Sequence, residues 1–253
     1  MAGGDAGALP ERCGGGWNGG MPATPVIDPP PTPRDGGAEE HDMALTLPQR
    51  LYLLSYDLDR NRLDPVSAAC RDHLLSAAAL VELVLGGWVR DQGGRAVRTG
   101  VGAPGDSFLV EVLAGVSTDR PRPWVNAVMS QMTRAEGTVR GQLAAGGAVT
   151  VGRGRVLGLF PTRTVAPGRP EELRRLRERI RGAVLSGRDP QAVPIEDAAL
   201  AVIAVEGDVW TLLAPKERRR HRKALRALRD RFDAEFPRLR RAICMAVAHS
   251  RSA

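Results

Sequence analysis

The chain has 253 residues, of which 43% are hydrophobic, so it is long enough to form a domain with a substantial core. This composition excludes a wholly disordered chain, and no apolar run approaches the ~18–20 residues that a membrane-spanning helix requires. The formal net charge of +7 favours acidic partners such as anionic membranes or nucleic acids. Nearly all of the 36 basic residues are arginines, which is typical of a GC-rich bacterial genome.

The first 43 residues show no regular spacing of apolar side chains. They contain ten Gly and seven Pro, a composition typical of disordered segments. We therefore predict a disordered Gly/Pro-rich tail at 1–43 and a folded domain at 44–253.

The folded part is expected to begin with a short helix, because Thr46 and Gln49 match a capping box ahead of several leucines. The next segment, Asp57–Asn61, resembles the beginning of an EF-hand loop. Arg62 and Ala68, however, stand where that loop requires a glycine and a bidentate acid. We expect a polar turn here and no calcium site.

The most apolar stretch begins near Asp64 and ends at a glycine pair. Asp64 can accept backbone N–H bonds at a helix start, and Pro65 suits the first helical position. From 74 to 85 only Ser76 and Glu82 interrupt the apolar side chains. Because a helix that is apolar on all faces belongs in the interior of a protein, this stretch is predicted to be a buried central helix.

Alternating apolar residues around glycine-containing turns predict two small β-hairpins. Apolar residues at three- and four-residue spacing predict further helices. The hairpins are expected at 88–98 and 148–160, and the helices at 106–116, 121–145, 169–184, 195–205, 216–229 and 237–249. The sequence thus predicts a mainly α fold, a single helical domain around the central helix.

Residues that could carry catalysis or bind metal are scattered. The histidines are isolated, and Cys13, Cys70 and Cys244 form no C-x-x-C pair. His73 lies on the apolar helix and is expected to be a buried structural imidazole. We therefore predict a non-catalytic protein without a metal or other cofactor.

Four segments taken in order carry a resemblance to a known family: LTLPQRLYLLSYD, LLSAAALVELVLGGWV, GAPGDSFLVEVL and GAVTVGRGRVLGLFPTRTVAP. Together they make the region from about Ala44 to His249 similar to the Golgi phosphoprotein 3 family. Eukaryotic members are mostly helical peripheral membrane proteins that bind phosphatidylinositol-4-phosphate and act as adaptors. The resemblance implies a cytoplasmic protein that binds a phosphoinositide or another anionic phospholipid at the inner membrane surface. A protein partner is also implied, but its identity is unknown.

The family's headgroup pocket uses one Trp and one Arg near the central helix and two Arg three residues apart on a later helix. The corresponding positions here hold Ser67, Ser76, Thr133 and Glu136, so none of these residues is retained. Three nearby arginines are candidates for a displaced headgroup site, because each lies beside one of these positions or one helical turn away. These candidates are Arg71, Arg134 and Arg140.

The second hairpin corresponds to the apolar loop that family members insert into the bilayer. Its candidate membrane-contacting residues are Val156, Leu157, Leu159 and Phe160. The alternative is that this strand packs on the helical core.

A different function remains open at this point. A helix followed by a hairpin is typical of a winged-helix nucleic-acid-binding regulator, and the basic run Lys216–Arg229 could neutralise phosphates. A recognition helix must expose polar side chains to a groove, however, whereas the helix at 74–85 is nearly all apolar. We therefore expect an anionic membrane surface as the partner and no nucleic acid.

Overall fold

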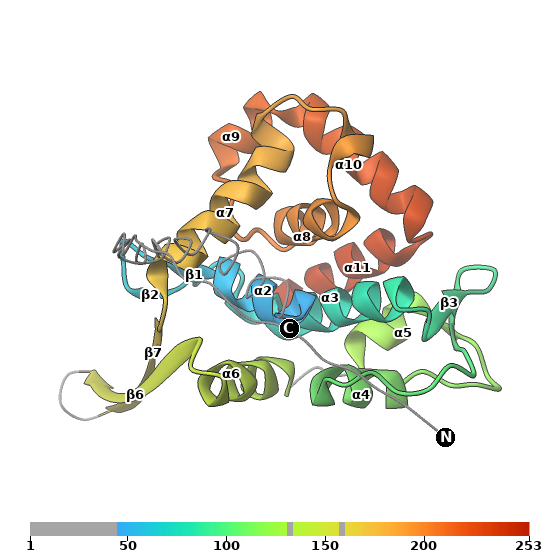
Figure 1. Cartoon of the computed structure of the whole chain (residues 1–253), viewed down its shortest axis with the longest axis horizontal. Coiled ribbons are helices and arrows are strands. Elements are labelled where there is room, and N and C mark those ends of the chain that lie inside the picture. Colours follow the sequence, from blue (N-terminus) through green and yellow to red (C-terminus); the bar gives the residue numbers. More distant parts are fainter. Residues whose placement is uncertain (1–44, 131–133, 157–159, 253) are drawn as a thin grey trace, which may run out of the picture. The chain divides into compact units, whose positions relative to one another are not determined.

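Figure 1 shows a computed structural model of the chain, which describes residues 45–130, 134–156 and 160–252. For 153–156 and 160–163 it describes the backbone alone. The predicted tail at 1–43 lies outside the described residues. The described part is mainly α, as the sequence predicted. Its α-helices are α2 (Leu47–Leu54), α3 (Arg71–Leu85), α4 (Ser107–Ala114), α5 (Trp124–Met129), α6 (Ala135–Ala145), α7 (Pro170–Leu185), α8 (Ile195–Glu206), α9 (Pro215–Arg220), α10 (Arg222–Glu235) and α11 (Leu239–Ser252).

The strands form three small antiparallel sheets. The hairpin predicted at 88–98 is present as β3–β4. The second hairpin, expected at 148–160, instead extends over 149–167 as β6–β7, and residues 152–155, predicted as its turn, lie within the strand β6. The structure adds a short pair, β1–β2, and a third strand, β5, which pairs with β4. The strands are β1 (Tyr56–Asp57), β2 (Arg62–Leu63), β3 (Val89–Asp91), β4 (Arg95–Arg98), β5 (Arg122–Pro123), β6 (Val149–Val156) and β7 (Phe160–Pro167).

Helix α3 is the predicted buried central helix. From Leu74 to Leu83 its apolar side chains are almost completely excluded from solvent, and Glu82 is half-buried. Helices α2, α4, α5, α6, α8 and α11 all pack against it, so every face has an apolar neighbour. These contacts on all sides explain why α3 is apolar on every face.

The predicted start of this helix was wrong. Arg71 is the first α-helical residue, and a short 3₁₀ helix, Ala68–Cys70, precedes it. One carboxylate oxygen of Asp64 accepts a local bond from the Val66 N–H at 2.8 Å, whereas the other accepts the N–H of Trp210 at 2.7 Å. Asp64 thus joins the start of this segment to the loop after α8, and it does not cap α3.

Helix α8 is the second buried helix, and α7, α10 and α11 pack around it. These three helices are amphipathic; α10, for example, buries Leu225, Leu228 and Phe232 and exposes its basic residues. At the end of α8, Gly207 lies so close to α3 that a Cβ atom would be 2.2 Å from Leu74 Cδ1. Only glycine permits this approach of the two buried helices.

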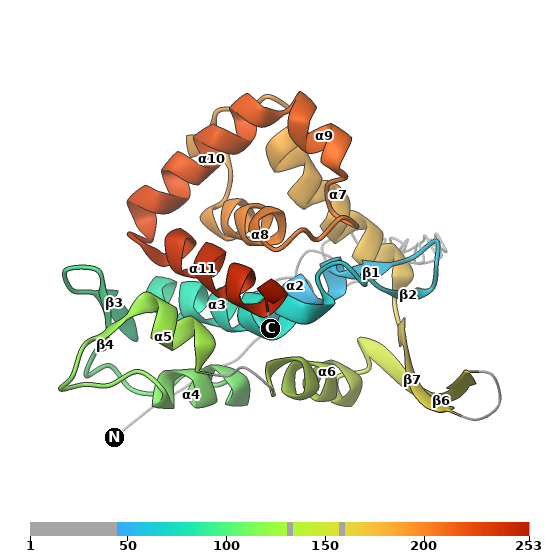
Figure 2. The same cartoon turned by 180° about the vertical axis from the view of Figure 1, so that it is seen from behind.

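The helix expected over 121–145 is instead two helices, α5 and α6. Helix α5 ends at Met129, and α6 begins at Ala135. Both pack on α3, so the break allows two helices to cover different parts of the central helix. Figures 1 and 2 show α4 and α6 on one side of this unit and α9 and α10 on the other.

Candidate functional site

Arg71, the first of the three candidate arginines, is a buried residue of the core. Its side chain is 5% exposed, and its Nη1 group donates to the Glu136 carboxylate at 3.0 Å. The Nη2 group donates to the backbone carbonyl of Asp64 at 2.5 Å, while Nε has no hydrogen-bond partner among the described residues. Arg71 therefore joins α3 to α6 and to the segment before α3.

Arg140 binds the same carboxylate from within α6. Its Nη1 group lies 3.3 Å from Glu136 Oε1, and the two side chains are 19% and 25% exposed. The backbone N–H of Glu136 donates to Asp72 Oδ1 at 2.7 Å. Burial, followed by the charge of Glu136, raises the pKa of the nearby Tyr52 hydroxyl to about 12, although Arg140 and Arg71 act in the opposite direction.

The structure thus brings Arg71 and Arg140 together on one internal carboxylate. The third candidate, Arg134, is exposed and precedes the first residue of α6. The Asp72 carboxylate lies beside Glu136, so two acidic groups already balance the charges of Arg71 and Arg140. A phosphate at this place must compete with Glu136 for the donors of Arg71 and Arg140.

The positions that correspond to the family's headgroup residues differ in their surroundings. Ser67 and Ser76 are both fully buried, and the Ser76 hydroxyl donates to the Asp72 carbonyl at 2.9 Å. Glu136 holds the two arginines, and Thr133 lies outside the described residues. Ser67 and Ser76 are therefore part of the interior and do not face solvent.

The β6–β7 hairpin connects α6 to α7. Its register pairs Val149 with Pro167 at the base and Val156 with Phe160 at the far end. In Figure 1 the strands extend from the ends of α6 and α7 away from the helices. The remaining candidates, Leu157 and Leu159, lie outside the described residues. The backbone register thus places Val156 and Phe160 at the end farthest from α6 and α7.

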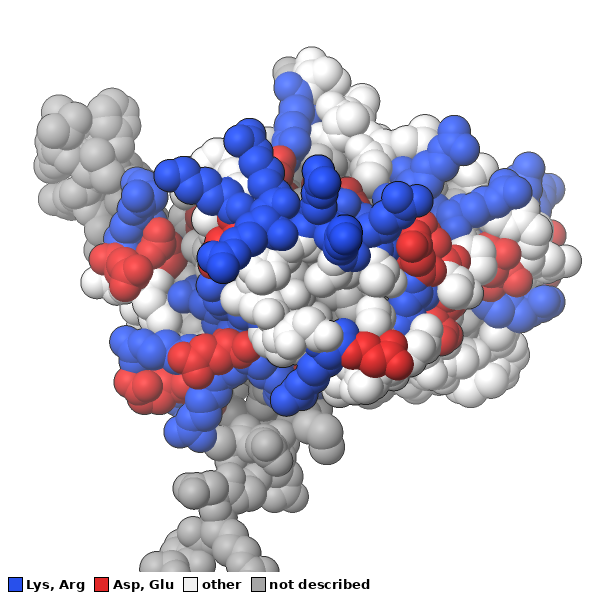
Figure 3. All heavy atoms as spheres, turned by 90° about the horizontal axis from the view of Figure 1, so that it is seen from above, with Lys and Arg blue, Asp and Glu red and all other residues white. Residues whose placement is uncertain are grey.

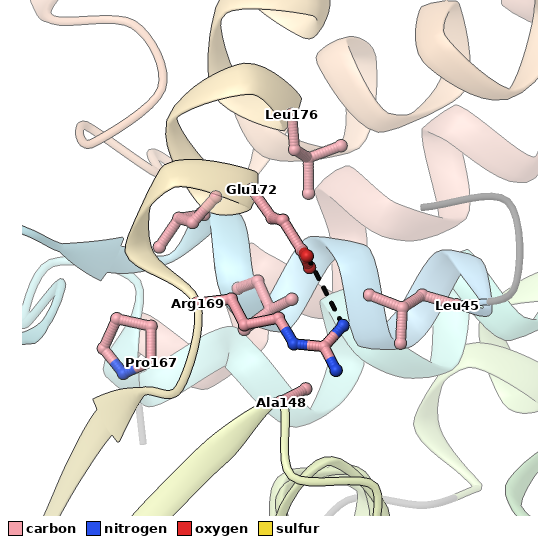
Figure 4. A pocket seen from close by; sticks show the side chains of 8 residues that line it. Leu45, Ala148, Pro167, Arg169, Glu172 and Leu176 are labelled. Atoms are coloured by element: carbon pink, nitrogen blue, oxygen red, sulfur yellow. Dashed lines mark hydrogen bonds and ion pairs between the residues drawn. The ribbon is translucent and has the colours of Figure 1, made fainter. Parts of the chain in front are cut away.

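A small apolar pocket lies where the hairpin joins the helices (Figure 4). Leu45, Ala148 and Pro167 form part of its wall, and an ion pair between Arg169 and Glu172 at 3.4 Å crosses its opening. Its volume of about 20 Å³ is close to that of a single water-sized sphere. The pocket is therefore too small for a lipid headgroup.

His73 occupies the buried position expected for it. The Ser250 hydroxyl lies 3.0 Å from Nδ1, and Nε2 is buried with no hydrogen-bond partner among the described residues. Burial lowers the pKa of the imidazole. Over the described ranges, no three His, Cys, Asp or Glu side chains gather as metal ligands would, and none of the helices has the length and apolar character needed to cross a membrane.

Comparison with known proteins decides the family. The family model of Golgi phosphoprotein 3 (GPP34) matches residues 47–246. The chain belongs to the Golgi phosphoprotein 3 family. The match begins at the first residue of α2 and ends within α11, so it covers nearly all described elements of this Golgi phosphoprotein 3 domain. No curated protein matches the chain.

The structure also bears on the winged-helix alternative for this Golgi phosphoprotein 3 family member. A helix that reads DNA must present side chains to the major groove. Leu75, Ala79 and Leu83 of α3 are completely buried by other helices, and β3–β4 follows directly after it. Helix α3 has no free face for a groove, so this alternative is not favoured.

Proposed function

We propose that this protein is a non-catalytic peripheral membrane protein that binds anionic phospholipid through the β6–β7 hairpin. The observation that carries the proposal is the hairpin register, in which Val156 pairs with Phe160 at the far end of the two strands; in the sequence, two leucines stand between them. Membership of the Golgi phosphoprotein 3 family supports the same function.

The sequence next to this apolar end is basic. Arg153 and Arg163 occupy directly paired positions, and Arg155 is two pairs closer to the end. Burial of an apolar side chain contributes at most ~1.5–3 kcal/mol, and each Arg near an anionic surface contributes roughly 1 kcal/mol. A few such residues suffice for reversible attachment without recognition of a particular headgroup.

Headgroup selectivity is a separate part of the proposal. Arg134 is exposed, whereas Arg71 and Arg140 are already bound to Glu136. A lipid phosphate would contact Arg134 first and gain the other two arginines only by replacing the Glu136 carboxylate. We therefore expect anionic phospholipids to bind in general, with at most a modest preference for phosphatidylinositol-4-phosphate.

Co-sedimentation with vesicles tests this function. The wild-type protein is expected to bind phosphatidylglycerol-containing vesicles and not vesicles of phosphatidylcholine alone. The double substitution Leu157→Asp and Phe160→Asp should abolish binding, because two charges would have to enter the apolar part of the bilayer. Vesicles containing phosphatidylinositol-4-phosphate at the same surface charge measure the selectivity.

The matched control is Val101→Asp with Val110→Asp, since these valines are 56% and 41% exposed and lie outside the hairpin. This control should bind vesicles as the wild type does. Equal binding by the hairpin variant and the wild type would show that the hairpin does not contact lipid.

A further inference from the structure

Helices α9 and α10 present a strongly basic surface, which we call the α9–α10 face. Six of its cationic side chains are exposed and make no hydrogen bond or ion pair with any described residue. Figure 3, which looks onto this side, shows Lys and Arg side chains gathered across it. These six are Lys216, Arg219, Arg220, Arg222, Lys223 and Arg226.

A depression of about 640 Å³ lies in this face, between the end of α8 and the two basic helices. Arg219 and Arg222 line it together with Arg218 and Arg229, while Leu225 contributes an apolar surface. This volume is in the range of sites that hold a small ligand or a short peptide segment.

The acids in the depression are already neutralised. Arg229 Nε donates to Glu206 Oε1 at 2.7 Å, and Arg240 lies 3.7 Å from the same oxygen. Asp208 is bound by Arg218 and also by Arg251, at 2.6 Å. Each carboxylate therefore has two guanidinium partners, and the positive charges of Arg219 and Arg222 remain uncompensated.

The α9–α10 face is remote from the proposed membrane contact. In both Figure 1 and Figure 2 these helices lie on the opposite side of the helical unit from α6 and the β6–β7 hairpin. A protein attached to a membrane through the hairpin would turn this face toward the aqueous phase. The excess positive charge here is thus available to a soluble partner.

We propose that the α9–α10 face binds an acidic segment of a partner protein, with carboxylates of an extended chain held by Arg219 and Arg222. Arginine binds carboxylates through two parallel N–H donors, and it does so better than lysine. An extended chain carries one side chain per ~3.3–3.6 Å, so several acidic residues reach the six exposed cations along one segment.

A nucleic acid suits this face less well. Single strands are held by bases stacked on aromatic side chains, and in the described part of the chain no Trp, Tyr or Phe lines the depression. A duplex is recognised by a protein element that enters its groove, whereas here Arg219 and Arg222 line a hollow that must itself receive the partner. The two exposed arginines in this hollow, together with the absence of an aromatic side chain from its described lining, favour an acidic polypeptide.

Fluorescence anisotropy of labelled oligoglutamate, measured with the full chain at low salt, tests the proposal. The double variant Arg219→Glu/Arg222→Glu should lower the affinity by about tenfold or more. The neutral variant Arg219→Gln/Arg222→Gln should show a smaller decrease in the same direction. Binding by the wild type should weaken with added salt, because screening shortens the range of these charges.

The matched control is Arg90→Glu/Arg122→Glu, which changes the net charge equally at exposed arginines of β3 and β5. It should bind oligoglutamate as the wild type does, and circular dichroism with thermal melting should show all variants folded. If this control and Arg219→Glu/Arg222→Glu lose affinity for oligoglutamate equally, the effect depends on net charge alone and the proposal is wrong.

Two further probes address the other partners. Oligothymidylate of the same formal charge should bind more weakly than oligoglutamate; tighter binding that depends on Arg219 and Arg222 would make the face a nucleic-acid site. Anionic vesicles should bind the Arg219→Glu/Arg222→Glu variant as they bind the wild type. Loss of vesicle binding in that variant would assign the face to lipid and refute the protein partner.

Discussion

At the scale of single residues, Glu136 determines what the candidate arginines can bind. Its carboxylate lies within 3.0 Å of Arg71 and 3.3 Å of Arg140, so it occupies donors that a phosphate would need. Spacing along the sequence did not reveal this pair, because Arg71 and Glu136 are 65 residues apart. The sequence predicted the arginines as candidates but not the acid that joins them.

Glu136→Gln should therefore have two measurable effects. The free energy of unfolding should fall by about 1–3 kcal/mol, because buried Arg71 loses its charged partner. Affinity for anionic vesicles should rise, since Arg71 and Arg140 become available to lipid phosphate. Chemical denaturation and co-sedimentation measure the two quantities.

Glu235→Gln is the control for Glu136→Gln, because Glu235 is exposed and forms no hydrogen bond or ion pair with a described residue. It should change neither stability nor vesicle binding. If Glu136→Gln is destabilised but binds vesicles no better, then Arg71 and Arg140 are structural residues only.

His73 makes stability depend on pH. Burial lowers its pKa in the folded protein below the ordinary value of 6.5. The unfolded chain therefore binds a proton first as the pH falls below about 6.5, and the free energy of unfolding decreases until the lower folded-state pKa is reached. The steepest contribution of one such group is about 1.4 kcal/mol per pH unit.

Denaturation curves between pH 7.5 and 5, a range set by the ~6.5 reference pKa of His, measure this contribution. His73→Leu should flatten the dependence, because leucine binds no proton. An unchanged slope in His73→Leu would assign the pH dependence to other groups.

At the scale of elements, the contact between α3 and α8 limits which residues the chain tolerates. Gly207→Ala should lower the free energy of unfolding by about 1–3 kcal/mol, because the new methyl group would overlap Leu74 in a filled core. Combining it with Leu74→Ala should give a loss smaller than the sum of the two single losses.

Gly137→Ala is the control for this close approach. Gly137 lies on the exposed face of α6, and a Cβ atom there would meet nothing within 4 Å. This substitution should raise the free energy of unfolding by about 0.4–1 kcal/mol. Strictly additive effects of Gly207→Ala and Leu74→Ala would show that α3 and α8 are not in close contact at this point.

The elements also show what local sequence can predict. The periodicity of apolar residues correctly predicted α7, α8, α11 and most of α3, since burial on one or all faces leaves a local signal. The single helix expected at 216–229 is instead two helices, α9 and α10, and α10 continues to Glu235. The start of α3 was missed because Asp64, which has the sequence of a helix cap, bonds to Trp210 in a distant loop. Strand β5 was missed because it has two residues and depends on pairing with β4.

For the whole molecule, composition indicated an acidic partner but not where it binds. In the described structure some arginines form ion pairs, such as Arg71 and Arg140 with Glu136. Six exposed cations on α9 and α10 form no such pair with a described residue. The strands β6 and β7 and the basic α9–α10 face lie on opposite sides of the helical unit. This arrangement suits a protein that connects a membrane to a soluble acidic partner.

The junction of the hairpin with α6 and α7 has a mechanical consequence. The Gly168 N–H donates to the Ala148 carbonyl at 2.9 Å, and a Cβ atom on Gly168 would lie 2.4 Å from the Gly147 carbonyl oxygen. Because a glycine at 168 permits this contact, the two strands lie close together at their base, and each has eight residues and a length of roughly 26 Å. For strands of this length, a change of about 10° in their direction at the base would displace the far end by about 4–5 Å. A small change at Gly168 would therefore be amplified along the hairpin.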